Sequence, residues 1–149
     1  MRSMFLPFVR YADFNGRATR TEFWLFSLLN VIVWIAGFVL MFGGLLSLDV
    51  SGRGGGSTVP GAGFWFGIIL LMVWWLATLV PYAAVSVRRL HDRDMPGWWY
   101  LGFVISWFVP LVSLFTSIAF IVIMALPPTR GTNQYGPDPR GPADLDVFR

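Results

Sequence analysis

The stretch FWLFSLLNVIVWIAGFVLMFGGLLSL, residues 23–48, decides the fold because it holds no charged side chain. A helix that crosses a hydrocarbon core of about 30 Å needs about 20 apolar residues. Residues 64–87 and 98–126 are two further uncharged blocks of sufficient length. Their continuous apolar runs argue against a membrane β-barrel, whose strands would alternate apolar and polar residues. The sequence therefore predicts an all-α integral membrane protein.

The composition agrees with this class and excludes several others. Of 149 residues, 56% are hydrophobic and 13% are charged, about half the charged share of an ordinary soluble domain. Cys is absent, His occurs once, and all eleven cationic side chains are Arg. These counts exclude disulfides, thiolate nucleophiles, two-His metal sites and a phosphate-binding or Schiff-base lysine. No cofactor is expected, and the scattered Arg residues do not form the basic stripe of a nucleic-acid-binding protein.

The chain divides by composition into three parts. A segment of residues 1–22 precedes the membrane domain of residues 23–126, and a tail rich in Pro and Gly follows at 127–149. Within the membrane domain, the glycine-rich residues 49–63 read as a flexible connector. Gly63 and Gly67 have the small-xxx-small spacing of helix contacts, which we attribute to chance in so glycine-rich a stretch.

The start of the first membrane helix can be read from its capping residues. Thr19 is followed three residues later by Glu22, immediately before the apolar block. This spacing is the capping box, in which each side chain accepts a hydrogen bond from a backbone amide of the first turn. The helix is therefore predicted to begin near Arg20.

The third apolar block, residues 98–126, allows two architectures. As one helix it would be about 43 Å long, and Pro110 near its middle removes a backbone donor and clashes with the preceding turn. The block is either one kinked span or two short helices in a hairpin that enters and leaves on one side. Trp107 is too near the first aromatic cluster to reach the opposite interface on a straight helix, which favours the hairpin. Three to four membrane helices are expected.

The Arg residues near the span ends predict the orientation in the membrane. Cytoplasmic loops of inner-membrane proteins carry an excess of Arg and Lys. The N-terminal segment and the connector between the second and third blocks are therefore predicted to be cytoplasmic, and the glycine-rich connector to face outward. The hairpin would enter and leave on the cytoplasmic side and would therefore give a cytoplasmic tail, in agreement with the Arg residues that the tail holds. The Arg positions are 2, 10, 17 and 20 in the N-terminal segment, 53 in the glycine-rich connector, 88, 89 and 93 in the second connector, and 130, 140 and 149 in the tail.

Three short polar motifs on the proposed cytoplasmic side resemble a known family. They are Gly-Arg-Ala-Thr-Arg-Thr-Glu-Phe-Trp at 16–24, Arg-Arg-Leu-His-Asp at 88–92 followed by Gly-Trp-Trp at 97–99, and Asn-Gln-Tyr-Gly-Pro-Asp-Pro at 133–139. In this order they are similar to the bacterial inner-membrane proteins grouped as domain of unknown function 805. The resemblance spans nearly the whole chain, and it implies a small inner-membrane protein without supplying a reaction.

We group the polar side chains of these motifs as the polar cap and expect them to meet on one face. Lipid anchoring by the Arg residues and an internal ion-pair network are both open as roles for them. The tail is expected to fold back onto the Arg clusters, with Asp138 meeting an Arg and Tyr135 stacking over a guanidinium. The ten residues of the polar cap are Arg17, Arg20, Glu22, Arg88, Arg89, His91, Asp92, Asn133, Tyr135 and Asp138.

Three classes of function compete. The favoured one is a non-enzymatic membrane module that binds anionic lipid, a membrane protein or its own copies through the polar cap. The alternative is a small transporter or channel component with a path past Asn30 and the breaks at Pro81 and Pro110, although no ionisable residue lies deep in the spans. A membrane enzyme that acts on a lipid or phosphate substrate through Arg88, His91 and Asp92 has the least support, because the adjacent residues His91 and Asp92 would point about 100° apart on a helix.

Overall fold

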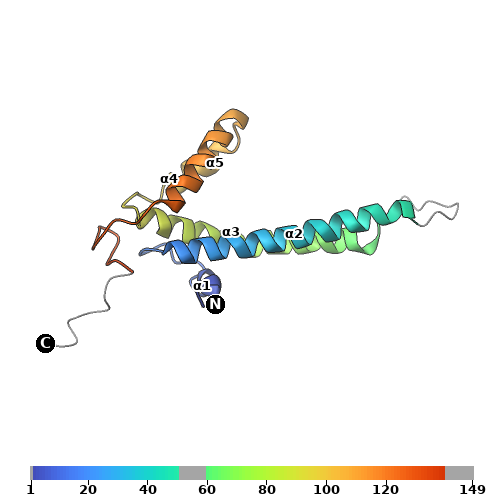
Figure 1. Cartoon of the computed structure of the whole chain (residues 1–149), viewed down its shortest axis with the longest axis horizontal. Helices are drawn as coiled ribbons and strands as arrows, with labels where there is room; N and C mark the ends of the chain where they lie inside the picture. Colours follow the sequence, from blue (N-terminus) through green and yellow to red (C-terminus); the bar gives the residue numbers. More distant parts are fainter. Residues whose placement is uncertain (1, 51–59, 140–149) are drawn as a thin grey trace. The chain divides into compact units, whose positions relative to one another are not determined.

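The computed structural model describes residues 2–50 and 60–139, and its regular structure over these residues is helical. The predicted all-α class is confirmed, with two long apolar helices and a shorter one. Most of the glycine-rich connector and the last ten residues of the tail lie outside the described residues. The helices are α1 (Arg2–Val9), α2 (Arg20–Val50), α3 (Ala62–His91), α4 (Trp99–Ser106) and α5 (Pro110–Ala125) (Figure 1).

The described residues form two compact units. The first unit contains the residues up to Phe26 and those from Val80 onward, and the second unit is Ser27–Leu79. The first unit thus holds α1, α4, α5 and the tail, together with the first turns of α2 and the last turns of α3. The second unit consists of the greater part of the two long helices.

In the second unit, α2 and α3 run antiparallel and touch through glycines (Figure 1). A Cβ added to Gly44 would lie 2.0 Å from the backbone nitrogen of Phe64, and one added to Gly67 would lie 2.6 Å from the backbone nitrogen of Met41. Only a residue without a side chain allows such a close backbone approach. The interpretation of the Gly63 and Gly67 spacing as chance is therefore wrong, because both face α2.

A side-chain hydrogen bond joins the same two helices within the second unit. The indole Nε1 of Trp74 donates to Oδ1 of Asn30 at 3.1 Å, and the Asn30 side chain is buried. In lipid, such a bond holds two helices together because no water competes for the groups. Only 17% of the apolar span of α2 and 22% of that of α3 is buried. These helices are therefore not core helices of a soluble protein, and their exposed apolar side chains suit contact with lipid.

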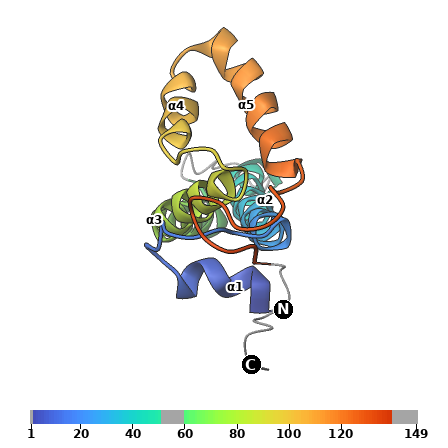
Figure 2. The same ribbon diagram turned by 90° about the vertical axis from the view of Figure 1, so that its left-hand side faces the viewer.

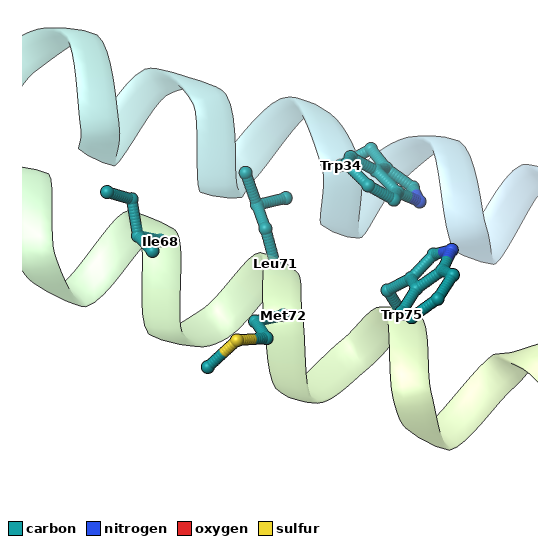
Figure 3. A pocket seen from close by; sticks show the side chains of 5 residues that line it. All are labelled: Trp34, Ile68, Leu71, Met72 and Trp75. Atoms are coloured by element: carbon teal, nitrogen blue, oxygen red, sulfur yellow. The ribbon is translucent and has the colours of Figure 1, made fainter.

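A shallow apolar groove of about 370 Å³ lies along this helix pair (Figure 3). Trp34 of α2 lies beside Trp75 of α3 at one end of the groove, and Leu71 points toward α2. The lining offers hydrocarbon surface and indole rings, as expected of a helix surface that is covered by lipid chains.

In the first unit, the N-terminal segment forms a helix that the sequence analysis did not assign. Residues of α1 pack against the start of α2, with the rings of Phe8 and Phe26 edge to face at 5.3 Å between centroids. Pro7 lies inside α1 and is fully buried. A single short helix with an internal Pro gives no periodic signal of its own, and its stability comes from this packing.

The third apolar block is broken in the way that the hairpin prediction requires. The structure ends α4 at Ser106 and begins α5 with Pro110 in its first turn, where the missing amide costs no hydrogen bond. Val109, which precedes the proline, has the extended backbone expected at such a position. The hydroxyls of Ser106 and Thr116 lie 2.7 Å apart and join the two helices, which stand side by side in Figure 2.

Candidate functional site

The capping residues at the start of α2 direct a carboxylate into the polar cap. Helix α2 begins at Arg20 as predicted, and the amide of Glu22 donates to Oγ1 of Thr19 at 3.2 Å. The Glu22 carboxylate faces α3, where its Oε1 lies 3.0 Å from Nη2 of Arg88. The Thr19 half of the capping box is thus formed, and the glutamate joins an ion pair between two helices.

The cap makes a prediction for helix stability. Thr19→Ala is expected to lower the free energy of unfolding by about 0.5–2 kcal/mol, because the amide of Glu22 loses its acceptor. Thr19→Ser keeps the hydroxyl and should leave stability unchanged. Thermal unfolding of the purified protein in detergent measures both, and equal midpoints for the two variants would contradict the capping role.

Asp92 is the centre of the buried charge network. Its Oδ1 accepts a hydrogen bond from Nε of Arg17 at 2.8 Å, and its Oδ2 pairs with Nη1 of Arg89. Asp92 is 1% exposed and Arg89 is 0% exposed. Each carboxylate oxygen therefore binds a guanidinium out of contact with water, the setting in which a charge-assisted pair is strongest.

The same guanidiniums hold the backbone of α5 and the tail. Nη1 and Nη2 of Arg17 donate to the carbonyls of Gly131 and Thr129 at 2.6 and 2.7 Å. Nε of Arg89 donates to the carbonyl of Met124 at 3.1 Å, and Nη2 donates to that of Leu126. Carbonyls at the end of a helix lack partners in the next turn, and a cation is favourable there. These bonds bring the N-terminal segment, the end of α3 and the tail together.

The tail lies against the end of α3, where Figure 2 shows it crossing the ends of α2 and α3. The amide of Thr129 donates to the carbonyl of Asp92 at 3.0 Å, and Nδ2 of Asn133 donates to the carbonyl of His91 at 2.8 Å. The ring of Tyr135 stacks on the imidazole of His91, with 3.9 Å between centroids and 5° between planes. The expectation that Tyr135 stacks over a guanidinium is therefore wrong.

His91 is surrounded by contacts that use its ring for packing. Nδ1 lies 3.3 Å from the carbonyl of Gly16, whose φ of +80° suits glycine. A Cβ on Gly97 would lie 3.1 Å from Nε2 of His91 and 2.6 Å from Cγ1 of Val87. A glycine at 97 thus lets the loop after α3 close over the imidazole, and this arrangement suits a structural role for His91.

The buried charges do not balance within the described residues. Three buried guanidiniums, those of Arg17, Arg88 and Arg89, face the carboxylates of Glu22 and Asp92, which leaves one positive charge in excess. Nε and Nη1 of Arg88 are buried and have no hydrogen-bond partner among the described residues. The excess charge makes this end of the first unit attractive to anions.

The structure brings eight of the ten polar-cap residues into the contacts given above, and the other two are Arg20 and Asp138. Arg20 is half-buried, with its Nε buried and without a hydrogen-bond partner in the described part of the chain. Asp138 is half-buried in the tail. The sequence analysis missed Thr129 and Gly131, because backbone carbonyls and a lone hydroxyl before a turn leave no pattern to recognise.

A small pocket lies beside the polar cap, between α4 and α5. It encloses about 210 Å³ and is lined by aromatic rings and three hydroxyls. The ring of Phe120 contacts that of Phe103 edge to face at 5.2 Å between centroids, and it lies one turn of α5 before Met124, whose carbonyl binds Arg89. The lining includes Tyr82 of α3, Tyr100 and Phe103 of α4, Trp107, and Ser117 and Phe120 of α5.

Comparison with known proteins identifies the family to which these motifs belong. Residues 11–137 match the family described as protein of unknown function DUF805. The chain belongs to the DUF805 family. The matched range runs from the segment before Arg17 to the tail after Tyr135, so the DUF805 region includes all the contacts of Asp92 and His91 described above.

Several relatives of the chain come from Escherichia coli. Inner membrane protein YhaI of strain K12 is 34% identical over 130 residues, covering 87% of this chain and 88% of YhaI. Inner membrane protein YhaH of the same strain is 35% identical, covering 87% of this chain and 89% of YhaH. Uncharacterized protein YiiR is 28% identical over 85% of each chain. No solved structure matches the chain significantly.

Proposed function

We propose that this DUF805 protein is a multi-pass, non-enzymatic module of the bacterial inner membrane that binds anionic lipid on its cytoplasmic side. The observation that carries the proposal is the division of the arginines of the first unit. Arg17, Arg88 and Arg89 are buried in internal contacts, whereas another group remains exposed or half-exposed. The accessible group comprises Arg10, Arg20, Arg93 and Arg130.

Accessible guanidiniums and interfacial tryptophans together suit a layer of lipid headgroups. A guanidinium presents two donors to a phosphate, and an Arg near an anionic membrane surface contributes about 1 kcal/mol to binding. Trp98 and Trp99 are exposed and stacked, with 5.3 Å between their ring centroids. Exposed Trp side chains favour the depth at which headgroups meet hydrocarbon. The buried network holds the segments that present these groups.

The two competing functions have less structural support. Asn30, the polar residue expected to line a transport path, accepts a hydrogen bond from Trp74 within the helix pair. Pro81 lies inside the continuous helix α3 and does not break it. For an enzyme, Asp92 would have to leave two buried ion pairs before it could act on a substrate.

The orientation is part of the proposal and can be tested by reporter fusions. The hydrogen bonds from Arg17 to the carbonyls of Thr129 and Gly131 support a topology with the N-terminal segment and the tail on the same side of the membrane. A fusion after Arg149 should report the cytoplasm, and an insertion at Gly55 should report the periplasm. A periplasmic signal from the Arg149 fusion would contradict the proposed topology.

Neutralising the accessible arginines should weaken the binding of anionic lipid. In the variant Arg10→Gln, Arg20→Gln, Arg130→Gln, each lost cation is expected to reduce the affinity about fivefold, the equivalent of about 1 kcal/mol. Native mass spectrometry of the protein released from vesicles of phosphatidylglycerol and phosphatidylcholine would count the lipids retained and any second copy of the chain.

Arg53→Gln is the matched control, because it removes the same charge from the connector proposed to face the other side. It should retain the preference for phosphatidylglycerol at low salt. Equal retention of both lipids by the unaltered protein, or the same loss in Arg53→Gln as in the triple variant, would contradict headgroup binding on the cytoplasmic side.

A further inference from the structure

We propose that the pocket between α4 and α5 binds one acyl chain of a membrane glycerophospholipid, with the ester group of that chain at the pocket hydroxyls. The inference deepens the proposed lipid-binding function and rests on it for the source of the ligand. It assigns a site to the hydrocarbon part of the lipid, whereas the accessible arginines concern the headgroup.

The walls of the pocket suit a hydrocarbon chain. Phe103, Phe120 and Trp107 supply apolar surface, and the volume of about 210 Å³ is below the roughly 300–1,000 Å³ of pockets for drug-sized molecules. Trp107 and Ile121 at the edge are 60% and 55% exposed. Because the relatives YhaI and YhaH are named inner membrane proteins, lipid chains are the medium that we propose for this edge.

Two hydroxyls in the pocket have no hydrogen-bond partner in the described part of the chain. The hydroxyl of Ser113 donates to a carbonyl of its own helix. The hydroxyls of Ser106 and Thr116 bond each other and also lie within hydrogen-bond distance of carbonyls of their own helices. In contrast, the hydroxyls of Ser117 and Tyr100 have no hydrogen-bond partner among the described residues, although both residues line the pocket. A hydroxyl in an apolar setting is stabilised by an acceptor, and the ester carbonyl is the acceptor nearest to the chains of a glycerophospholipid.

The position of the pocket fits the order of groups along such a lipid. Phe120 in the pocket wall lies about 6 Å along α5 from Met124, whose carbonyl binds Arg89 at the polar cap. Trp98 and Trp99, at the start of α4, are exposed and suit the interface. A chain in the pocket with its ester at the hydroxyl of Tyr100, in the first turn of α4, would therefore have its phosphate toward the polar cap and its excess positive charge.

Photolabelling tests the site in nanodiscs made with phosphatidylglycerol that carries a diazirine in its acyl chain. Labelled peptides are then identified by mass spectrometry. We expect labelling at Phe103 and Phe120 to exceed that at Phe42 and Phe66, which are exposed on α2 and α3. Labelling spread evenly over these four positions would overturn the proposal, because it would show only the lipid that surrounds every exposed helix.

Filling the pocket should abolish the excess labelling. Ser117→Leu places a larger apolar side chain in the pocket, and Ser113→Leu makes the same change one helical turn away, outside the lining. We expect Ser117→Leu to reduce labelling of Phe103 and Phe120 to the level of the exposed helices and Ser113→Leu to retain it. Equal labelling in the two variants would overturn the proposal.

Tyr100→Phe tests the ester contact without changing the shape of the pocket. The loss of one hydrogen bond is expected to reduce the excess labelling about two- to tenfold, and unchanged labelling would overturn the assignment of the ester to this hydroxyl.

Phosphatidylcholine with the same diazirine chain separates this proposal from the headgroup proposal. Excess labelling of Phe103 by both lipids supports the pocket even where anionic selectivity is absent.

Discussion

Asp92→Asn is expected to lower the free energy of unfolding by about 3–5 kcal/mol, the largest effect of any single substitution considered for this protein. The amide keeps the shape of the carboxylate but has no charge. The guanidiniums of Arg17 and Arg89 would then be buried with no charged partner in the network except Glu22, which already faces Arg88. Unfolding of the purified protein by heat and by a strong detergent measures the loss.

Asp94→Asn is the matched control for this prediction. Asp94 lies two residues along the same turn and is exposed, and its φ of +60° is a conformation that Asn also tolerates. Asp94→Asn should leave the free energy of unfolding unchanged.

A double variant, Arg17→Gln with Asp92→Asn, tests the pair directly. It should lower the free energy of unfolding by less than the sum of its single changes because the two side chains interact. Additive losses would contradict a direct pair.

Gly44→Ala is expected to destabilise the helix pair by about 1–3 kcal/mol, because an added Cβ would meet backbone atoms of α3. That Cβ would lie 2.0 Å from the nitrogen of Phe64 and 2.6 Å from the carbonyl carbon of Gly63, so the two helices would have to separate. Backbone atoms cannot move aside as a flexible side chain can. Resistance of the folded protein to detergent unfolding measures the effect.

The adjacent glycine provides the control for this substitution. A Cβ on Gly43 would meet no atom within 4 Å, and both glycines lie in α2. Gly43→Ala should therefore leave the stability unchanged or raise it by up to about 1 kcal/mol, since Ala favours a helix more than Gly does. Equal destabilisation by the two variants would show that the effect comes from helix propensity or lipid contact and not from the approach of α3.

The features predicted correctly from the sequence are those that depend on neighbouring residues. The uncharged blocks fold into helices because unpaired backbone groups are costly in lipid. Thr19 marks the start of α2, because its hydroxyl accepts a hydrogen bond from an amide in the first turn of that helix. Pro110 divides the third block because its ring acts on the residues immediately before it. Helix α1 was missed because its stability depends on packing against Phe26.

Within the polar cap, the sequence indicated which side chains are polar and that they meet on one face, but not their partners. Glu22 was placed in a capping box, and the structure directs it to Arg88, 66 positions further along the chain. Tyr135 was paired with an Arg, and it stacks on His91. An Arg guanidinium and a His imidazole are both flat groups that can stack on an aromatic ring, so residue type alone cannot choose between them.

The sequence by itself determined that this is a helical membrane protein, where α2 begins and where the third apolar block breaks, because apolar length, capping and proline act over a few residues. Only the tertiary structure decided which glycines touch a neighbouring helix and which guanidiniums share Asp92. The pairs Gly44 with Phe64 and Arg17 with Asp92 join residues far apart in the chain. Such contacts depend on how whole helices pack. Any of the Arg side chains could pair with either carboxylate by its chemistry alone, and the packing of the helices determines which pairs form.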